Sequence, residues 1–364
     1  MGDDSRDLGS SPAKRGRGTV RSTVEGALVA LFLQPAIAHA TPNDTLILAK
    51  SPPKLLSEFG FFDDLKAQTP AEGVVPFTIA TPLFSDNALK YRFVYVPKGK
   101  QAAYDETEAF DFPVGSALIK TFAFPADYRK PDENIRVIET RVMLRQDSGW
   151  LSQAYVWNAE QTEAVLKIAG AKVDIETIAA DGSPLAFTYA VPNRNQCKGC
   201  HAFNGEIVPL GPKARNLNLT TGSDAKNQLS HWSELGILAN LPENPPDVPN
   251  ARDSAAPIDA RARAWLDVNC AHCHRREGPA SNSGLFLTFN EQNPVAIGIN
   301  KRPVAAGKGS GGREFDIKPG DPDGSILLYR VESTEPGVMM PELGRHLADP
   351  DAVALLRDWI LTLR

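Results

Sequence analysis

The chain has 364 residues, of which 42% are hydrophobic, and a formal net charge of −5. This length predicts two domains rather than one. The acidic balance argues against a nucleic-acid-binding role and favours partners with basic docking patches. No apolar run after residue 40 reaches the length of a membrane span, so the sequence predicts no transmembrane anchor.

The N-terminus has the pattern of an export signal. A basic segment at residues 14–21 precedes a mostly apolar stretch at 27–38, which is too short to span a bilayer comfortably. A small-x-small cleavage site ends at Ala40. We therefore expect residues 1–40 to be a cleaved signal peptide and the mature protein to be periplasmic.

The next part of the chain, residues 41–192, has the sequence pattern of short β-strands. Alternating or β-branched segments are predicted as strands at residues 91–96, 117–124, 135–145, 151–157 and 187–191. The sequence Asp147-Ser148-Gly149 is a good hairpin turn between two of them. We predict a β-rich sandwich or barrel domain here.

The remaining residues have the pattern of helices and loops. Asp224 is predicted to cap a helix at 225–235, and a proline-rich connector then completes a segment of residues 193–250. Beyond it, Asp259 is predicted to cap a helix at 260–269, and Asp349 to cap one near the C-terminus. The expected fold class is α+β, with a mainly α domain at residues 251–364.

All four cysteines belong to two Cys-x-x-Cys-His pentads. The first pentad is Cys197-Lys198-Gly199-Cys200-His201 and the second is Cys270-Ala271-His272-Cys273-His274. This pattern is typical of c-type haem attachment, in which the two thiols bond to the haem vinyl groups. The adjacent histidine ligates the iron on one side, which is called the proximal side. The sequence therefore predicts two covalently bound haem c groups, with His201 and His274 as proximal ligands.

Two other uses of these cysteines are possible. Two Cys-x-x-Cys knuckles can together hold a structural zinc ion, and a single Cys-x-x-Cys can act as a redox dithiol. Zinc does not require a histidine directly after each pair, and a dithiol explains neither the duplication nor the histidines. Haem attachment is the interpretation that we favour.

The helices at the two ends of residues 251–364 resemble those of class I cytochrome c domains, where the terminal helices pack together. In such domains a Met-Pro pair after the pentad supplies the second axial ligand of the iron, the distal ligand. The resemblance implies Met340, followed by Pro341, for haem 2 in preference to Met339. Thioether ligation suits an electron carrier because it raises the reduction potential. The alternative is that both methionines only fill a core.

The distal ligand of haem 1 is left open by the sequence. His231, on the helix after the first pentad, and Met143, before the hairpin turn, are the candidates, and an open site is the third possibility. We expect His272 to serve only its own pentad, and His346 to lie near haem 2.

Short motifs along nearly the whole mature chain resemble a family of exported two-haem c-type cytochromes. This family combines an N-terminal β-rich domain with a C-terminal class I cytochrome c-like domain. The matching stretches are residues 81–86, 112–116, 139–141, 155–158, 192–197, 210–218, 227–229, 268–274, 320–322 and 340–344. Members are often encoded near a parallel β-helix protein, so the resemblance implies such an exported protein as a redox partner.

These observations predict a periplasmic two-haem electron carrier with no catalytic residues of its own. The alternative is a peroxidase-like oxidoreductase, in which haem 1 keeps an open face and haem 2 supplies electrons. The two hypotheses differ in the coordination of haem 1.

Overall fold

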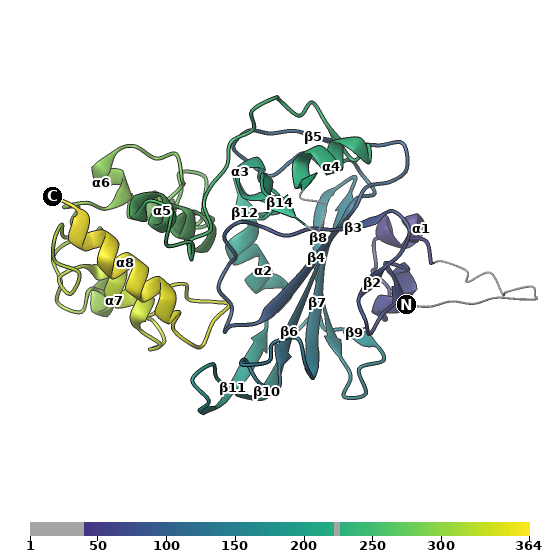
Figure 1. Ribbon diagram of the computed structural model, residues 1–364, viewed down its shortest axis with the longest axis horizontal. Coiled ribbons are helices and arrows are strands. Elements are labelled where there is room, and N and C mark those ends of the chain that lie inside the picture. The colour runs from purple at the N-terminus through teal and green to yellow at the C-terminus, as the bar shows by residue number, and fades with distance from the viewer. Residues whose placement is uncertain (1–39, 222–225) are drawn as a thin grey trace, which may run out of the picture. The chain divides into compact units, whose positions relative to one another are not determined.

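A six-stranded antiparallel sheet organises the first half of the structure, a computed structural model that describes residues 40–221 and 226–364. Its strand order is β3-β4-β6-β7-β8-β9 (Figure 1). The strands are β3 (Val74–Pro76), β4 (Leu89–Tyr95), β6 (Ala117–Pro125), β7 (Ile135–Gln146), β8 (Gly149–Trp157) and β9 (Ala164–Leu166). Together with the helices described below, this sheet makes the fold a mixed α/β one.

The predicted strands of this region are confirmed. β4, β6, β7 and β8 cover the alternating segments, and the predicted turn joins β7 to β8. Gln146 pairs with Gly149, which leaves Asp147 and Ser148 as the two-residue loop. Gly149 has a φ of +113°, a conformation that glycine adopts without strain.

The sheet is open, so the expectation of a barrel is wrong. β3 and β9 form its two edges, and each has only three residues. An isolated bridge from Leu55 to Val165 covers the β9 edge, which protects its unpaired backbone groups. A second layer exists only in part, as a separate hairpin of β10 (Ala171–Ile178) and β11 (Pro184–Val191).

This hairpin and the N-terminal segment bury the two faces of the sheet. Phe122 and Phe124 pack with Ile175 and Tyr189 of the hairpin. A different core joins sheet residues such as Tyr155 to two short helices, α1 (Asp44–Ile47) and η1 (Leu56–Phe59). The remaining strands of this region are β1 (Phe62–Asp64), β2 (Thr69–Pro70) and β5 (Ala102–Ala103).

Residues 193–250 consist of short elements. They are α2 (Arg194–His201), β12 (Ala202–Phe203), β13 (Glu206–Ile207), α3 (Ala214–Leu217), β14 (Thr220–Thr221), β15 (Lys226–Asn227), α4 (Gln228–Glu234) and β16 (Leu238–Ala239). The predicted helix 225–235 starts later than expected, because the Asn227 side chain accepts from the N–H groups of Leu229 and Ser230 and caps α4. The predicted cap Asp224 lies outside the described residues. Leu229 and Trp232 bury α4 against the β-rich region.

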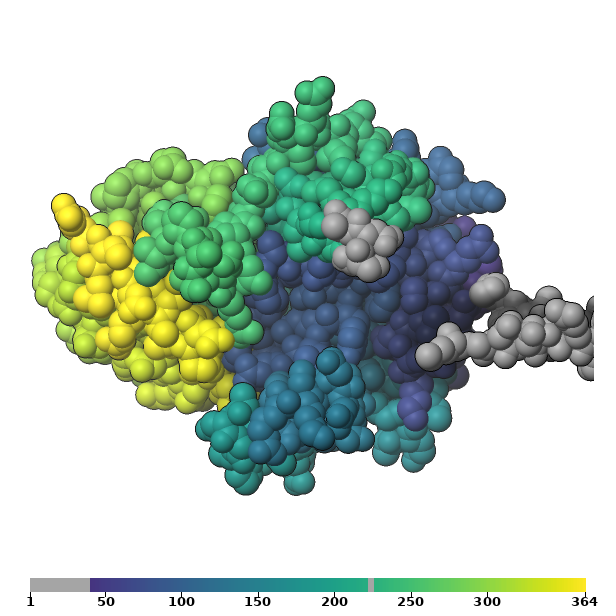
Figure 2. Space-filling view, viewed as in Figure 1, coloured from purple at the N-terminus to yellow at the C-terminus, as the bar shows by residue number. Residues whose placement is uncertain are grey.

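The described elements after Ala251 are all helical. They are α5 (Ile258–Asn269), η2 (Ser281–Ser283), α6 (Pro294–Ile297), η3 (Gly307–Ser310), α7 (Ile326–Glu332) and α8 (Pro350–Thr362). α5 packs against α8 (Figure 1), so the two terminal helices of this region are in contact. One side of α8 lies on the molecular surface (Figure 2), while Leu356, Trp359 and Ile360 enter a common core with α5.

The two predicted caps in this region have different outcomes. Asp349 caps α8 as expected, accepting from the N–H of Ala352 at 3.2 Å. Asp259 does not cap α5, because the helix begins at Ile258. Instead, Asp259 lies in the first turn and accepts from the indole N–H of Trp359 at 2.8 Å, so it links α5 to α8.

The described ranges contain no helix that is both long and apolar enough to cross a membrane. The predicted signal peptide, residues 1–40, lies outside them except for Ala40 and stays a prediction.

Candidate functional site

The first pentad lies on its own short helix, α2, directly after β11. Asn193 and Gln196 form a reciprocal cap at its start, each side chain accepting from the other's N–H at 2.9 Å. The helix packs against β8 of the main sheet. Cys197 and Cys200, three residues apart on a helix, project from the same side of α2. That arrangement suits attachment of both thiols to one planar group.

The second pentad closes α5. Cys270 is the C-cap residue, and its carbonyl accepts from the N–H groups of Cys273 and His274 at 3.1 and 2.9 Å. This turn holds the pentad in a compact loop at the end of the helix. Ala271 is buried, and burial raises the pKa of the Cys270 thiol to about 12. The second pentad is therefore part of the helical core.

The two pentads are in direct contact in the fold. A sulfur of Cys200, a ring nitrogen of His272 and the sulfur of Cys273 all lie within 4.8 Å of one another. The Cys273 thiol also donates to the carbonyl of Gly199 across 3.6 Å. Hydrogen bonding from Cys273, followed by that from His272, lowers the pKa of Cys200 to about 4. Residues that are more than seventy positions apart thus form one cluster.

Both predicted proximal histidines are held in the form that binds a metal. Nδ1 of His201 lies 2.8 Å from the carbonyl oxygen of Val208, and Nδ1 of His274 lies 3.3 Å from the hydroxyl of Ser283. The Ser283 hydroxyl itself donates to the carbonyl of Ala280, so it accepts from His274. A proton on Nδ1 leaves the Nε2 lone pair available for iron. Burial lowers the pKa of each ring to about 4, which keeps both neutral at pH 7.

A cavity of about 400 Å³ lies beside the pentads, and we call it the pentad cavity. This volume falls in the range that is usual for cofactor sites. Residues of both pentads line it: Cys197, Cys200, His201 and His272. Every methionine of the chain other than Met1 lines it as well: Met143, Met339 and Met340. Sulfur and imidazole groups from distant parts of the sequence therefore converge on a single space.

The candidates for the distal ligand of haem 1 differ in whether they line the pentad cavity. His231 lies on α4 and is not among the residues that line the pentad cavity, so the structure does not bring it to the first pentad. Met143, on β7, does line the cavity. So does His272, whose Nδ1 is buried without a hydrogen-bond partner within the described part of the chain. The sequence suggested that His272 serves only its own pentad, whereas in the fold it faces the other one.

Arg345 fixes the loop that carries Met340. The side chain is only 4% exposed, and it donates two hydrogen bonds to the Met340 carbonyl, at 2.8 and 3.2 Å. It donates further to the carbonyls of Arg330, Ser333 and Leu347. A guanidinium with five donors is the side chain that can satisfy so many acceptors.

Asp86 connects this same loop to the β-rich region. Its carboxylate is buried and accepts from the N–H groups of His346 and Leu347 at 2.6 and 2.8 Å. The loop is therefore anchored at both ends of the segment between Met340 and α8. No spacing pattern in the sequence links Asp86 to residues that lie 260 positions later.

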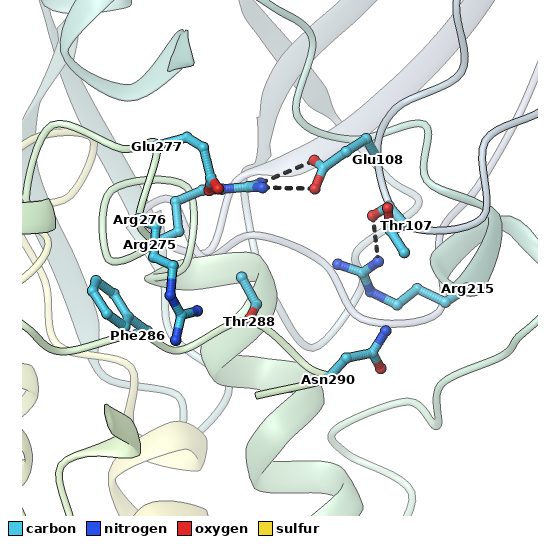
Figure 3. A pocket seen from close by; sticks show the side chains of 9 residues that line it. All are labelled: Thr107, Glu108, Arg215, Arg275, Arg276, Glu277, Phe286, Thr288 and Asn290. Carbon is cyan, nitrogen blue, oxygen red and sulfur yellow. Dashed lines mark hydrogen bonds and ion pairs between the residues drawn. The ribbon is translucent and has the colours of Figure 1, made fainter. Parts of the chain in front are cut away.

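Ion pairs of Arg275 and Arg215 tie the second pentad to neighbouring loops, and Figure 3 shows the one between Arg275 and Glu108. Arg275, directly after the second pentad, donates to both carboxylate oxygens of Glu108 at 2.6 and 2.9 Å. Its guanidinium also lies over the ring of Phe203, just after the first pentad, 4.6 Å from the centroid. A second pair, between Arg215 and Asp267 on α5, is almost fully buried at 2.8 Å. These contacts fix the pentads relative to each other.

No protein-family model, curated protein or solved structure matches this chain significantly. We therefore infer function from the site itself. Its donors fit a c-type haem: paired thiols, neutral imidazoles with a free Nε2, and nearby thioethers. The cluster of Cys200, His272 and Cys273 also offers three ligands of the kinds that zinc prefers.

Proposed function

We propose that this protein is an exported two-haem c-type cytochrome that transfers electrons in the periplasm. Cys197 and Cys200 would attach haem 1, and Cys270 and Cys273 would attach haem 2. His201 and His274 are the proposed proximal ligands, and Met340 the distal ligand of haem 2. Residues 251–364 would then act as a class I cytochrome c-like domain.

The observation that carries the proposal is the composition of the pentad cavity. Thiols, imidazoles and all three described methionines gather there, although methionine is scarce in this chain. Haem supplies one-electron redox chemistry when it is bound. The chain brings Cys200 and Cys273 together within 4.8 Å, which suits electron exchange between two centres held there. An exported parallel β-helix protein is the proposed redox partner.

For haem 1, the cavity favours Met143 or His272 as the distal ligand over His231. Either ligand would complete the coordination of the iron and support a carrier. An open position would instead support the alternative proposal, a peroxidase-like oxidoreductase.

A zinc site is the second candidate function, favoured by the cluster of Cys200, His272 and Cys273. It leaves unexplained why His201 and His274 both have Nδ1 engaged and Nε2 free. In a zinc protein, these two histidines would have no reason to share that arrangement.

The test is to produce the chain in a host with c-type haem maturation and to measure haem and zinc per polypeptide. We expect two haems per chain that stay bound after denaturation, together with the corresponding increase in mass. The matched control is His272→Gln, which removes a zinc ligand but neither pentad's Cys-x-x-Cys-His pattern. If one equivalent of zinc is bound instead, and His272→Gln loses it, the haem proposal is wrong.

A further inference from the structure

A row of cationic side chains crosses three neighbouring strands of the sheet. Arg92 on β4 pairs directly with Lys120 on β6, and Lys120 pairs directly with Arg141 on β7. Lys90 lies two residues before Arg92 and so projects from the same face. Like charges in directly opposed positions destabilise a sheet. The fold therefore needs negative charge beside this row.

Only one member of the row forms a direct ion pair within the described residues. Arg141 donates to both oxygens of Glu139, at 2.5 and 3.0 Å, and this carboxylate is fully buried. Glu139 also accepts from the hydroxyl of Tyr189 at 2.6 Å, so the carboxylate is already engaged. Glu139 therefore balances the charge of Arg141, and the other members of the row form no ion pair with it.

Arg92 and Lys120 make no ion pair with any residue in the described ranges. Arg92 donates from Nη1 to the Lys90 carbonyl at 3.2 Å, while its Nη2 is buried without a partner. The Lys120 ammonium lies over the face of the Phe122 ring, 4.8 Å from the centroid, and the charge of Glu139 acts on it without forming an ion pair. Burial, followed by the neighbouring cations, lowers the pKa of Lys120 well below its usual value.

Arg92 and Lys120 both line the pentad cavity, and Arg141, which pairs with Lys120, lies close enough to Cys197 and His201 for its charge to act on them. Six lysine and arginine side chains line the cavity in all: Arg92, Lys120, Arg141, Lys213, Arg275 and Arg345. The other four are already satisfied, by Glu139, by Glu108 or by backbone carbonyls. Two cations without an ion pair thus face the cavity that the first pentad also lines.

We propose that Arg92 and Lys120 bind the two propionate carboxylates of haem 1, an assignment that rests on the proposed haem function. The two carboxylates equal the two unpaired cations in number and carry the opposite charge. Arginine offers paired donors to a carboxylate, and lysine offers a point charge. In this assignment the sheet tolerates a row of like charges because the propionates neutralise two of them.

The test uses the fully matured protein and the propionate bending bands in its resonance Raman spectrum. Arg92→Gln and Lys120→Met are each expected to shift a propionate band of one haem and to leave those of the other haem unchanged. Lys120→Arg should retain the wild-type band. The matched control is Lys90→Met, which removes a cation from the same face but not from the cavity wall, and which should leave the bands unchanged.

Thermal unfolding of the haem-loaded protein gives a second readout. Lys120→Met should lower the unfolding temperature, because it removes a partner of the carboxylate, whereas Lys120→Arg and Lys90→Met should leave it close to that of the unmodified protein.

Two results would overturn separate parts of these proposals. A matured chain without haem would overturn the proposed function. Two bound haems with Raman bands that neither substitution shifts would overturn only the propionate assignment. If succinate then perturbs the haem spectrum saturably, and both variants lose that response, the two cations serve a free carboxylate ligand instead.

Discussion

The first pentad lies on a short helix against the sheet, whereas the second closes a long helix inside a helical core. None of the residues of α2 is fully buried, while α5 buries half of its length, with Trp265 and Leu266 among its core residues. His201 donates to a backbone carbonyl, and His274 to a serine hydroxyl. The same five-residue pattern is thus supported by two different kinds of structure, and each can be perturbed alone.

The largest expected effect comes from removing one pair of thiols at a time. Cys197→Ala with Cys200→Ala should reduce the bound haem from two to one per chain and leave the helical core folded. Cys270→Ala with Cys273→Ala should also lose one haem and in addition lower the unfolding temperature, because this pentad belongs to the core. Haem per polypeptide and thermal unfolding by circular dichroism measure both effects. Equal losses of stability would show that the two regions do not differ as described.

The next largest effect is expected from removing the proposed thioether ligand, Met340. Met340→Ala should lower the potential of haem 2 by on the order of 0.1 V, because an axial methionine raises it. A high-spin signal should appear in the electron paramagnetic resonance spectrum as the sixth position opens. Met339→Ala, at the neighbouring position of the same cavity, is the matched control and should change neither.

The same spectrum of the unmodified protein separates the two proposals for haem 1. Two low-spin signals would favour the carrier, with both irons six-coordinate. If a high-spin signal is present before any substitution and Met143→Ala leaves it unchanged, haem 1 is open and the oxidoreductase is favoured.

A smaller effect is expected at Arg345, the positioning residue of the Met340 loop. Arg345→Lys keeps the charge but loses the fork of donors that satisfies four backbone carbonyls. We expect a loss of about 2 kcal/mol in the free energy of unfolding and a weaker absorption band from methionine-ligated ferric haem. Arg357→Lys, on the exposed side of α8, should leave both quantities unchanged.

The smallest expected effect concerns the basic row and pH. Burial lowers the pKa of Lys90 to about 7, against about 10.5 in the unfolded chain. Between these values the unfolded state binds more protons, so the stability of the haem-free protein should rise with pH. From pH 7 to pH 9 the contribution of Lys90 should be about 2 kcal/mol. Urea unfolding at both pH values measures it, and Lys90→Met should reduce the gain by this amount and leave the part that comes from Lys120, whose pKa is also lowered. If Lys90→Met keeps the full pH dependence, other groups cause it.

The sequence predicted much of the local structure. Strands β4, β6, β7, β8 and β11 and helices α5 and α8 follow from alternation, helical spacing and one good cap, Asp349. It failed at two helix starts: Asn227 caps α4, and α5 begins before Asp259, after Pro257 and without a side-chain cap. It also missed β10, although the alternation of Val173 and Ile175 with Asp174 and Glu176 fits a strand with one buried face.

The sequence by itself determined which donor groups are available, because each Cys-x-x-Cys-His pentad is a local pattern that places two thiols and an imidazole within five residues. Only the tertiary structure decided which groups meet. It brought Cys200 to His272 and Cys273, gathered Met143 and Met340 around one cavity, and left His231 outside it. The row of Arg92, Lys120 and Arg141 exists only through the pairing of three strands. Such proximities arise from burial and strand register between distant segments, which no local pattern encodes.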